Sequence, residues 1–326
     1  MVQGGVVVQF AIVAGTVIGL WIGARTLVDA VVKLARRFGV AELTIGLTIV
    51  AIGTSTPELV VSTDAALAGR GEIAVGNVVG SNVYNLAFIL GAVSLLQVIP
   101  VERSLVHRDG IALILATLAG FAVLFDRTVA SVEGIVLVGL FVLYTVYVLR
   151  DERSAPSIDT EYPDSRVTET VASGASFHGR DAALLVGGLA LVLASGHYMV
   201  EAATAIATEA GISDWVIGGT IVAAGTSTPE LAVSLVAMKR GHVGMSVGNV
   251  LGSNIFNVLG ILGVAAVIHP LAVTAAAIES LVWLTAITVA MVGALWSGRR
   301  LSRLEGGLFV LSEGVRWALG LLRIFG

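Results

Sequence analysis

The stretch Gly53-Thr54-Ser55-Thr56-Pro57-Glu58 occurs a second time as Gly225-Thr226-Ser227-Thr228-Pro229-Glu230, 172 residues further along the chain. The match around it runs without a gap from residues 45–91 to residues 217–263, and 28 of its 47 positions are identical. A second motif within the match, Gly76-Asn77-Val78-Val79-Gly80-Ser81-Asn82, recurs as Gly248-Asn249-Val250-Leu251-Gly252-Ser253-Asn254. The sequence therefore predicts two related halves, whose most polar stretches are among the best matched.

The composition predicts that these halves lie in a membrane. Of 326 residues, 56% are hydrophobic and 13% are charged, whereas soluble domains carry about 25% charged residues. The mean hydropathy is +0.94. A membrane span needs about 20 mostly apolar residues, and ten stretches qualify, the fourth being short: 5–30, 43–68, 73–98, 110–125, 128–149, 181–206, 215–238, 243–268, 271–296 and 304–324. The predicted fold class is an all-α polytopic membrane protein with ten transmembrane helices.

Several other classes of protein do not fit this composition. The chain has 19 Lys and Arg against 23 Asp and Glu, so it lacks the basic excess of a nucleic-acid-binding protein. It has no cysteine, which excludes disulfides and thiolate metal sites. No phosphate-binding loop or dinucleotide fingerprint occurs. We expect no cofactor, no nucleic-acid partner and no obligate protein partner, and we expect the lipid bilayer as the surroundings.

The only long polar segment, residues 150–180, divides the chain into residues 1–149 and 181–326, with five predicted spans each. Of the Lys and Arg residues between spans or beyond them, fourteen fall on the side of this linker and three on the other. The positive-inside rule then predicts a cytoplasmic linker and both termini outside. The expected location is the cell membrane. An odd number of spans inverts the second half, and inverted repeats are typical of secondary transporters with a mid-depth site.

The repeated motif predicts a broken helix in each half. Pro57 has no N–H, so the carbonyl of Gly53 loses its helical partner, and Pro229 has the same effect on Gly225. Thr56 suits an N-cap, with Pro57 and Glu58 in the first turn of a new half-helix. Irregular backbone at this depth is tolerated only against protein or a water-filled cavity. Freed carbonyls and hydroxyls would therefore offer oxygen ligands at both breaks.

Glu58 and Glu230 carry the charge at these breaks. A carboxylate at mid-membrane costs about 2.5–3.5 kcal/mol, and no Lys or Arg lies at that depth in predicted spans two, three, seven or eight. The missing partner is therefore expected to be an exchangeable cation. Oxygen-only ligands suit Ca²⁺, which takes six to eight of them, and Na⁺ is similarly hard. Zinc and copper are disfavoured, because neither motif contains Cys or His.

The second motif predicts further polar side chains that line this site. Asn77, Ser81 and Asn85 are spaced by four residues and share one helical face, as do their counterparts Asn249, Ser253 and Asn257. We interpret the glycines between them as close-packing positions. Asn85 and Asn257 are the candidate ligands. Asn77, Asn82, Asn249 and Asn254 are expected to satisfy the interrupted backbone.

These two motifs resemble those of the cation/Ca²⁺ exchanger superfamily and, within it, the prokaryotic sodium/calcium exchangers. The resemblance implies Ca²⁺/Na⁺ antiport by alternating access, with spans one and six as a mobile pair. It implies Glu58 and Glu230 as shared Ca²⁺ and Na⁺ ligands, with oxygens from Thr54 and Thr226 beside them. It also implies that Ser55, Ser227, Ser81 and Ser253 line flanking Na⁺ sites. The amides of Asn85 and Asn257 would complete the ring of ligands.

One position departs from part of this superfamily, because some relatives carry Asp where this chain has Asn257. The centre then holds two carboxylates, which balance one Ca²⁺ and leave the number of Na⁺ ions open. A proton/Ca²⁺ antiporter is the alternative, since that branch also works with two acidic residues. The form of the Gly-Thr-Ser-Thr-Pro-Glu motif favours Na⁺.

Two further functions were weighed. A cation channel would conduct without a counter-ion, and two broken helices around a central charge favour occlusion instead. An intramembrane hydrolase using Ser55 or Ser227 would need a base or dyad partner at the same depth, and Asp64 and the histidines lack the repeat placement that the serines have. We therefore expect a transporter that is not an enzyme.

Overall fold

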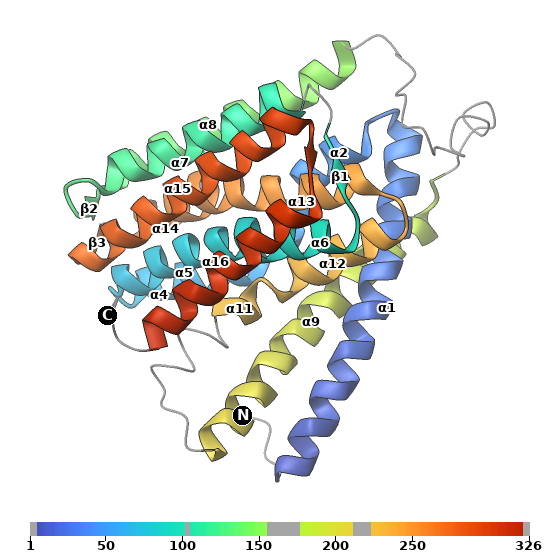
Figure 1. The fold of residues 1–326 in the computed structure, drawn as a ribbon, viewed down its shortest axis with the longest axis horizontal. Coiled ribbons are helices and arrows are strands. Elements are labelled where there is room, and N and C mark those ends of the chain that lie inside the picture. The colour runs from blue at the N-terminus through green and yellow to red at the C-terminus, as the bar shows by residue number, and fades with distance from the viewer. Residues whose placement is uncertain (1–4, 102–104, 155–176, 211–222, 322–326) are drawn as a thin grey trace.

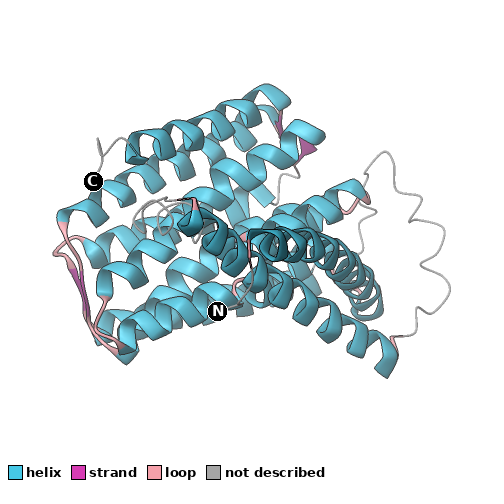
Figure 2. Cartoon of the chain, turned by 90° about the horizontal axis from the view of Figure 1, so that it is seen from below, coloured by secondary structure: helices cyan, strands magenta, loops and turns pink. Residues whose placement is uncertain are grey.

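The computed structural model describes residues 5–101, 105–154, 177–210 and 223–321 (Figure 1). This part of the chain is mostly helical. Its four strands have two residues each and lie between helices, as Figure 2 shows. The first half contains α1 (Val6–Phe38), α2 (Glu42–Ile45), η1 (Gly46–Val50), α3 (Ala51–Thr54), α4 (Thr56–Leu67), α5 (Gly71–Val83), η2 (Tyr84–Leu90), α6 (Gly91–Leu96), β1 (Ile99–Pro100), η3 (Leu105–Gly110), α7 (Ile111–Leu124), β2 (Thr128–Val129) and α8 (Ser131–Ser154).

The second half repeats this order within the described residues. It contains α9 (Gly179–Glu209), α11 (Ala223–Thr226), α12 (Thr228–Lys239), α13 (Val243–Ile255), η5 (Phe256–Ile261), α14 (Leu262–Ile268), β3 (Leu271–Ala272), α15 (Ala275–Gly298), β4 (Arg300–Leu301) and α16 (Arg303–Leu321). The elements labelled η are π-helical. Most of the predicted linker and the start of predicted span seven lie outside the described residues, so those two predictions stay open.

Seven helical segments of the described chain are long and apolar enough to cross a membrane. An eighth is counted if Glu42–Thr54 and Thr56–Leu67, bent by 48°, form one span. The tenth predicted span, α16, is not among them, and it carries four charged residues: Arg303, Glu305, Glu313 and Arg316. The chain is therefore a multi-pass membrane protein by composition and length, while the count of ten spans remains a prediction.

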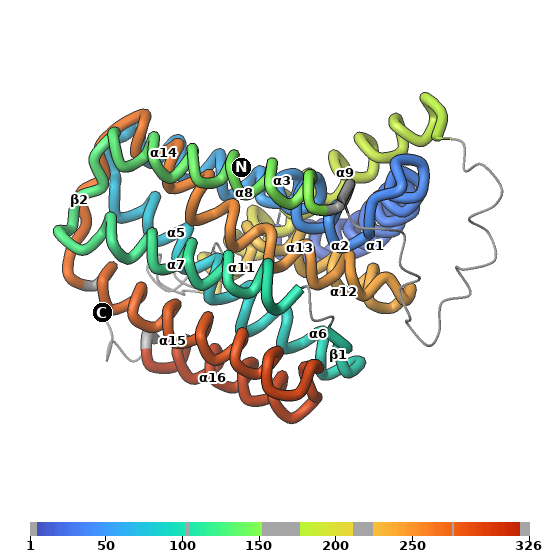
Figure 3. The backbone as a smooth tube through the Cα atoms, turned by 90° about the horizontal axis from the view of Figure 1, so that it is seen from above, coloured from blue at the N-terminus to red at the C-terminus, as the bar shows by residue number. Residues whose placement is uncertain are grey.

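Two continuous helical segments form the core of the bundle. The segments Gly71–Leu96 and Val243–Ile268 have 78% and 83% of their apolar windows buried, against 17% for Ser131–Asp151 in α8. Figure 3 shows α8 with α14 along one side and α15 with α16 along the opposite side, with α5 and α13 between them. The two segments that carry the second motif are therefore shielded by other helices, and their polar residues lie in the protein interior.

The helices α1 and α9 lie side by side and run at a steep slant to the rest of the bundle (Figure 1). Their backbones meet at Gly188, where an added Cβ would lie 2.8 Å from Leu27 N, so only glycine fits there. An ion pair joins them, with Lys33 Nζ 2.8 Å from Asp181 Oδ1. Another joins α1 to the end of α12, with Arg240 Nη2 2.6 Å from Asp29 Oδ1.

The four short strands follow the same offset as the sequence repeat. The strand β1 pairs with β4, and β2 pairs with β3, both antiparallel. A shift of 172 residues carries β1 onto β3 and β2 onto β4. Each strand therefore pairs with a strand of the other half, and the two pairs are counterparts. This exchange is the pattern that an approximate two-fold relation between two halves produces.

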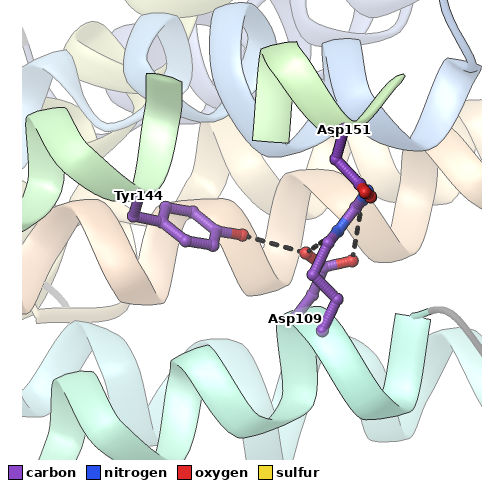
Figure 4. A network of polar contacts seen from close by, with 4 residues as sticks. Asp109, Tyr144 and Asp151 are labelled. Carbon is purple, nitrogen blue, oxygen red and sulfur yellow. Dashed lines mark hydrogen bonds and ion pairs between the residues drawn. The ribbon is translucent and has the colours of Figure 1, made fainter. Parts of the chain in front are cut away.

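The fourth span begins earlier than the sequence suggested. We expected it at residue 110, but its helix starts at Leu105 and includes Arg108 and Asp109. The early start was missed because two charged residues argue against a span, yet these two neutralise each other. Arg108 Nε lies 2.9 Å from Asp109 Oδ1, and Arg108 Nη1 lies 2.8 Å from Asp151 Oδ2. Tyr144 Oη also donates to Asp109 Oδ1 at 3.2 Å (Figure 4).

Candidate cation-binding site

Both copies of the first motif interrupt a helix, as predicted. The interruption falls at Ser55, with φ −80° and ψ 15°, and at Ser227, with φ −89° and ψ 10°. These values belong to the sparsely populated bridge region between helix and strand. The helices α4 and α12 start at the next residue, with their prolines in the first turn. Proline suits that position because the N–H it lacks has no intrahelical partner there.

The role expected of Thr56 was wrong in detail. Ser55 occupies the N-cap position, without a side-chain cap, and Thr56 is the first residue of α4. The Thr56 hydroxyl instead donates to Gly53 O at 2.7 Å, the carbonyl that Pro57 deprives of its helical partner. In the second half, Thr228 Oγ1 donates to Ala224 O at 3.3 Å. Thr56 therefore satisfies the carbonyl freed at the first break, whereas Thr228 bonds to the carbonyl one residue before the one that Pro229 affects.

The two breaks contact each other through an exchange of hydrogen bonds. Ser55 Oγ donates to Glu230 Oε1 at 2.8 Å, and Ser227 Oγ donates to Glu58 Oε1 at 2.8 Å. Each glutamate therefore accepts from the serine of the other half. Both carboxylates are 0% exposed. Hydrogen bonds to a charged acceptor are worth about 1.5–3 kcal/mol, so this exchange ties the halves together at the buried charges.

The remaining hydroxyls of the predicted site are buried, and one of them bonds to a glutamate. Ser81 Oγ donates to Glu58 Oε1 at 3.4 Å. Thr54 Oγ1 lies 3.1 Å from Asn249 Oδ1, and Ser253 Oγ lies 3.5 Å from Ala51 O. Thr226 is buried at the end of α11, directly before the second break.

The outer asparagines of the second motif bond to the backbone, as predicted. Asn77 Nδ2 donates to Glu58 O at 3.1 Å and to Ser62 Oγ at 2.9 Å. Its counterpart Asn249 donates to Glu230 O at 3.3 Å and to Ser234 Oγ at 3.0 Å. Each therefore fixes the half-helix that carries the glutamate of its own half.

The inner oxygens of the site are buried and have no hydrogen-bond partner among the described residues. They are Glu58 Oε2, Glu230 Oε2, Asn85 Oδ1 and Asn257 Oδ1, and all four residues are 0% exposed. Buried polar atoms without a hydrogen bond are rare, because each costs about 1–3 kcal/mol and more when charged. Carboxylate and amide oxygens are the ligands that hard cations prefer. The free atoms are therefore of the kind that a hard cation would satisfy.

No basic residue of the described chain neutralises the two glutamates. Its ion pairs involve other acids, namely Asp29, Glu42, Asp109, Asp151, Asp181 and Glu313. The same residues contain no group of three His, Cys, Asp or Glu side chains that could hold a metal ion. A cation here would have to combine two carboxylates with hydroxyl and amide oxygens, which suits Ca²⁺ or Na⁺ and not a transition metal.

Sequence reasoning missed the local helix geometry at the candidate ligands Asn85 and Asn257. Each is the second residue of a π-helical turn, in η2 and in η5. A π turn inserts an extra residue and changes the direction of the side chains, and such turns are frequent at functional sites. Polar spacing by four residues gave no sign of them. Their matching positions in the two halves were the one available hint.

The family model for the sodium/calcium exchanger protein matches residues 8–150 and 181–312. The chain belongs to this family. Its members are transporters, not enzymes. The fold also matches a solved structure of the sodium-calcium exchanger NCX_Mj, with a TM-score of 0.82 and 29% identity, covering 96% of this chain and 99% of that one.

Two curated relatives cover most of the chain. The putative antiporter CaxA of Alkalimonas amylolytica is 39% identical over 92% of this chain and 94% of its own length. The sodium/calcium exchanger MaX1 of Methanosarcina acetivorans is 31% identical over 82% of this chain and 85% of its own length. The family resemblance found in the two motifs is thereby confirmed, and cation exchange across a membrane follows as the general activity.

Proposed function

We propose that this protein is a secondary antiporter that exchanges Ca²⁺ for Na⁺ by alternating access. The observation that carries the proposal is the pair of buried glutamates, each hydrogen-bonded to the serine of the other half and each with one oxygen left free. Two adjacent carboxylates without a fixed base need mobile positive charge. One Ca²⁺ supplies it, and so do two Na⁺ ions, which makes the two cargoes mutually exclusive.

The ligands fall into two groups in this proposal. Glu58 and Glu230 bind both cargoes through their free oxygens, with Asn85 and Asn257 adding amide oxygens. The hydroxyls of Ser55, Ser227, Ser81 and Ser253, together with Thr54 and Thr226, complete the Na⁺ positions around them. Three of these hydroxyls, those of Ser55, Ser81 and Ser227, donate to a glutamate oxygen, which supports their assignment as ligands of a small monovalent ion.

Protons are the alternative counter-ion, and Asn257 is the observation that favours them. It leaves only two carboxylates at the centre, and two carboxylates can carry two protons against one Ca²⁺. Na⁺ is preferred for two reasons. The site is lined with hydroxyl oxygens that proton exchange would not need, and the relative that resembles this chain over 82% of its length is named a sodium/calcium exchanger.

Movement of α1 and α9 as one unit would alternate access to the site in this proposal. The pair is closely packed within itself at Gly188, and α1 also contacts α12, which carries Glu230. The ion pair between Asp29 and Arg240 joins the pair to α12, and both side chains are partly exposed. Such exposed pairs are worth about 0–1 kcal/mol, which is weak enough to break and re-form during a sliding motion.

The proposed topology places the termini outside and residues 150–180 in the cytoplasm. The chain has no cysteine, so single cysteines can report it without background. A cysteine at Ser157 should react with an impermeant maleimide only after the cells are permeabilised, and one at Asp126 should react in intact cells. The reverse pattern would contradict the orientation, and labelling of both sites in intact cells would contradict the placement of the linker.

The decisive experiment is flux with each gradient imposed alone. Purified protein in proteoliposomes loaded with Na⁺ should take up ⁴⁵Ca²⁺ after dilution into Na⁺-free buffer. Liposomes with equal Na⁺ on both sides serve as the control. Uptake driven only by an outward H⁺ gradient would replace Na⁺ by H⁺ in the proposal. Uptake without any counter-gradient would indicate a channel, and no uptake under any of these conditions would contradict Ca²⁺ antiport.

A further inference from the structure

The inner asparagines of the two halves are paired unequally. Asn82 uses both ends of its amide, donating Nδ2 to Asn254 O at 3.1 Å and accepting from Asn257 Nδ2 on Oδ1 at 2.9 Å. Its counterpart at the offset of 172 is Asn254. That residue donates Nδ2 to Val250 O of its own helix at 2.7 Å, and its Oδ1 has no partner. One half therefore makes an amide contact that the other half lacks.

The atoms left without a partner are the two that the missing contact would join. The counterpart of the bond from Asn257 to Asn82 is a bond from Asn85 Nδ2 to Asn254 Oδ1. Both of these atoms are buried and have no partner, and they belong to η2 and α13, which pack against each other. Buried amides are nearly always hydrogen-bonded. Asn85 Nδ2 is a free donor and Asn254 Oδ1 a free acceptor at the positions equivalent to the bonded pair. They therefore point to a hydrogen bond that forms in another arrangement of the halves.

The contact with Asn82 also determines which atom of Asn257 is free. Because Asn82 holds Nδ2, the remaining end of the Asn257 amide is Oδ1, an oxygen without a partner. An amide turned the other way would present its N–H₂ donor, which cannot coordinate a cation. Asn82 thus acts on the cation through Asn257. Asn85 has no such neighbour, since neither end of its amide is held.

From these contacts we propose that Asn82 and Asn254 are positioning residues used alternately. Each orients the ligating amide of the opposite half, Asn82 acting on Asn257 and Asn254 acting on Asn85. The first pair is formed in the present arrangement. When the halves exchange conformations, Asn254 releases Val250 O and holds Asn85, while Asn82 releases Asn257. This inference rests on the proposed antiport, in which two inverted halves exchange roles between inward and outward access.

The test measures the Ca²⁺ KM at each membrane face separately. Asn82→Ala and Asn254→Ala are reconstituted with a single orientation, and Na⁺-driven ⁴⁵Ca²⁺ flux is followed from either side. Loss of one buried hydrogen bond should raise the KM about five- to tenfold. Asn82→Ala should do so at one face and Asn254→Ala at the opposite face. Thr117→Val, which removes a buried hydroxyl of α7 bonded to Leu113 O, is the matched control.

A double variant separates positioning from a purely structural role. If Asn82 acts through Asn257, then Asn82→Ala in an Asn257→Ala background should change the KM by less than about twofold, whereas independent structural effects would multiply. Monodispersity by size-exclusion chromatography checks folding. If Asn82→Ala fails that check, Asn82→Ser takes its place, because serine is too short to bond to both Asn254 O and Asn257.

The outcomes separate this inference from the proposed function. If the wild-type protein transports Ca²⁺ and each variant changes the KM equally at both faces, the alternation is overturned. If the wild-type protein transports Ca²⁺ and neither variant changes the KM, the positioning role is overturned. It is also overturned if the effects of the two substitutions on the KM multiply in the double variant. A wild-type protein without cation-driven Ca²⁺ flux contradicts the antiport proposal and this inference together.

Discussion

The two halves make the same contact between Ser55 or Ser227 and the opposite glutamate, and different contacts at Asn82 and Asn254. The bonds from Ser55 to Glu230 and from Ser227 to Glu58 are both 2.8 Å long. The Asn257 amide donates to Asn82, whereas the Asn85 amide has no hydrogen-bond partner among the described residues. The matched contacts stabilise charge that must be accommodated throughout a transport cycle. The unmatched contacts distinguish one arrangement of the halves from the other.

Away from the centre, the polar networks of the two halves differ. Tyr144 in α8 donates to Asp109, and its counterpart at the offset of 172 is Arg316 in α16, which pairs with Glu313 instead. Glu313 and Arg316 are three residues apart on one helix, a spacing at which opposite charges can pair. Both networks bury an acid inside an apolar helix beside its own base. Each network lies within one half, so nothing requires the other half to repeat it, unlike the contacts between the halves around the glutamates.

The largest expected effect comes from the matched part. Glu58→Gln and Glu230→Gln should each lower Na⁺-driven ⁴⁵Ca²⁺ flux by at least about a hundredfold, because a charged ligand worth about 3 kcal/mol is lost. The symmetry of the contacts predicts equal losses. Glu279→Gln, which changes an exposed acid of α15, should transport normally. Wild-type flux in either glutamate variant would remove that residue from the site.

The hydroxyls that cross between the halves should matter next. Ser55→Ala and Ser227→Ala each remove one hydrogen bond to a carboxylate, and we expect the Ca²⁺ KM to rise about tenfold. Since the two bonds have the same length, the two variants should agree within about twofold. Ser312→Ala in α16 removes a hydroxyl bonded only to Phe309 O and serves as the control. Unequal effects would show that the matched contacts are not used equally.

A third carboxylate would sharpen the contrast between the asparagines. Asn85→Asp adds a third carboxylate to the two glutamates, whose mutual repulsion bound Na⁺ relieves, so half-maximal Na⁺ should fall about fivefold. In Asn257→Asp the new carboxylate meets Asn82 Oδ1, so two acceptors face each other and the gain should be smaller. The measurement is Ca²⁺ flux against Na⁺ concentration at fixed Ca²⁺. Equal shifts in both variants would argue that Asn82 does not hold Asn257.

Much of this organisation could be predicted from the sequence because repeats and prolines act locally. Pro57 and Pro229 remove a donor at a known position, so the breaks follow from covalent structure alone. The same local reasoning failed where tertiary contacts decide. The early start of the fourth span depends on the contacts of Asp109 with Arg108 and Tyr144. The hydrogen bonds from Ser55 and Ser227 to the glutamates of the opposite half depend on how the two halves pack.

The asparagines show a second limit of sequence reasoning. Asn77, Asn82, Asn249 and Asn254 were expected to bond to backbone, and each donates to a backbone carbonyl. For Asn77 and Asn249 the two contacts correspond. Asn82, however, donates to a carbonyl of the other half, whereas Asn254 donates to its own helix. The two motifs are nearly identical, so this difference depends on tertiary contacts that the sequence does not show.

The smallest expected effect concerns Thr56 and Thr228, the threonines that directly follow the two breaks. Thr56 donates to Gly53 O at 2.7 Å, three residues back, and Thr228 donates to Ala224 O at 3.3 Å, four residues back. Thr56→Val removes the shorter bond and leaves unpaired the carbonyl that Pro57 has already deprived of a donor, so it should destabilise the protein by about 1 kcal/mol. Thr228→Val should cost less, because its longer bond is weaker. Thermal unfolding in detergent would register the first change as a fall of about 2 °C in Tm, with Thr145→Ser in α8 as a conservative control. A larger fall for Thr228→Val would mean that the second break depends more on its threonine than the first, and would reverse this part of the comparison.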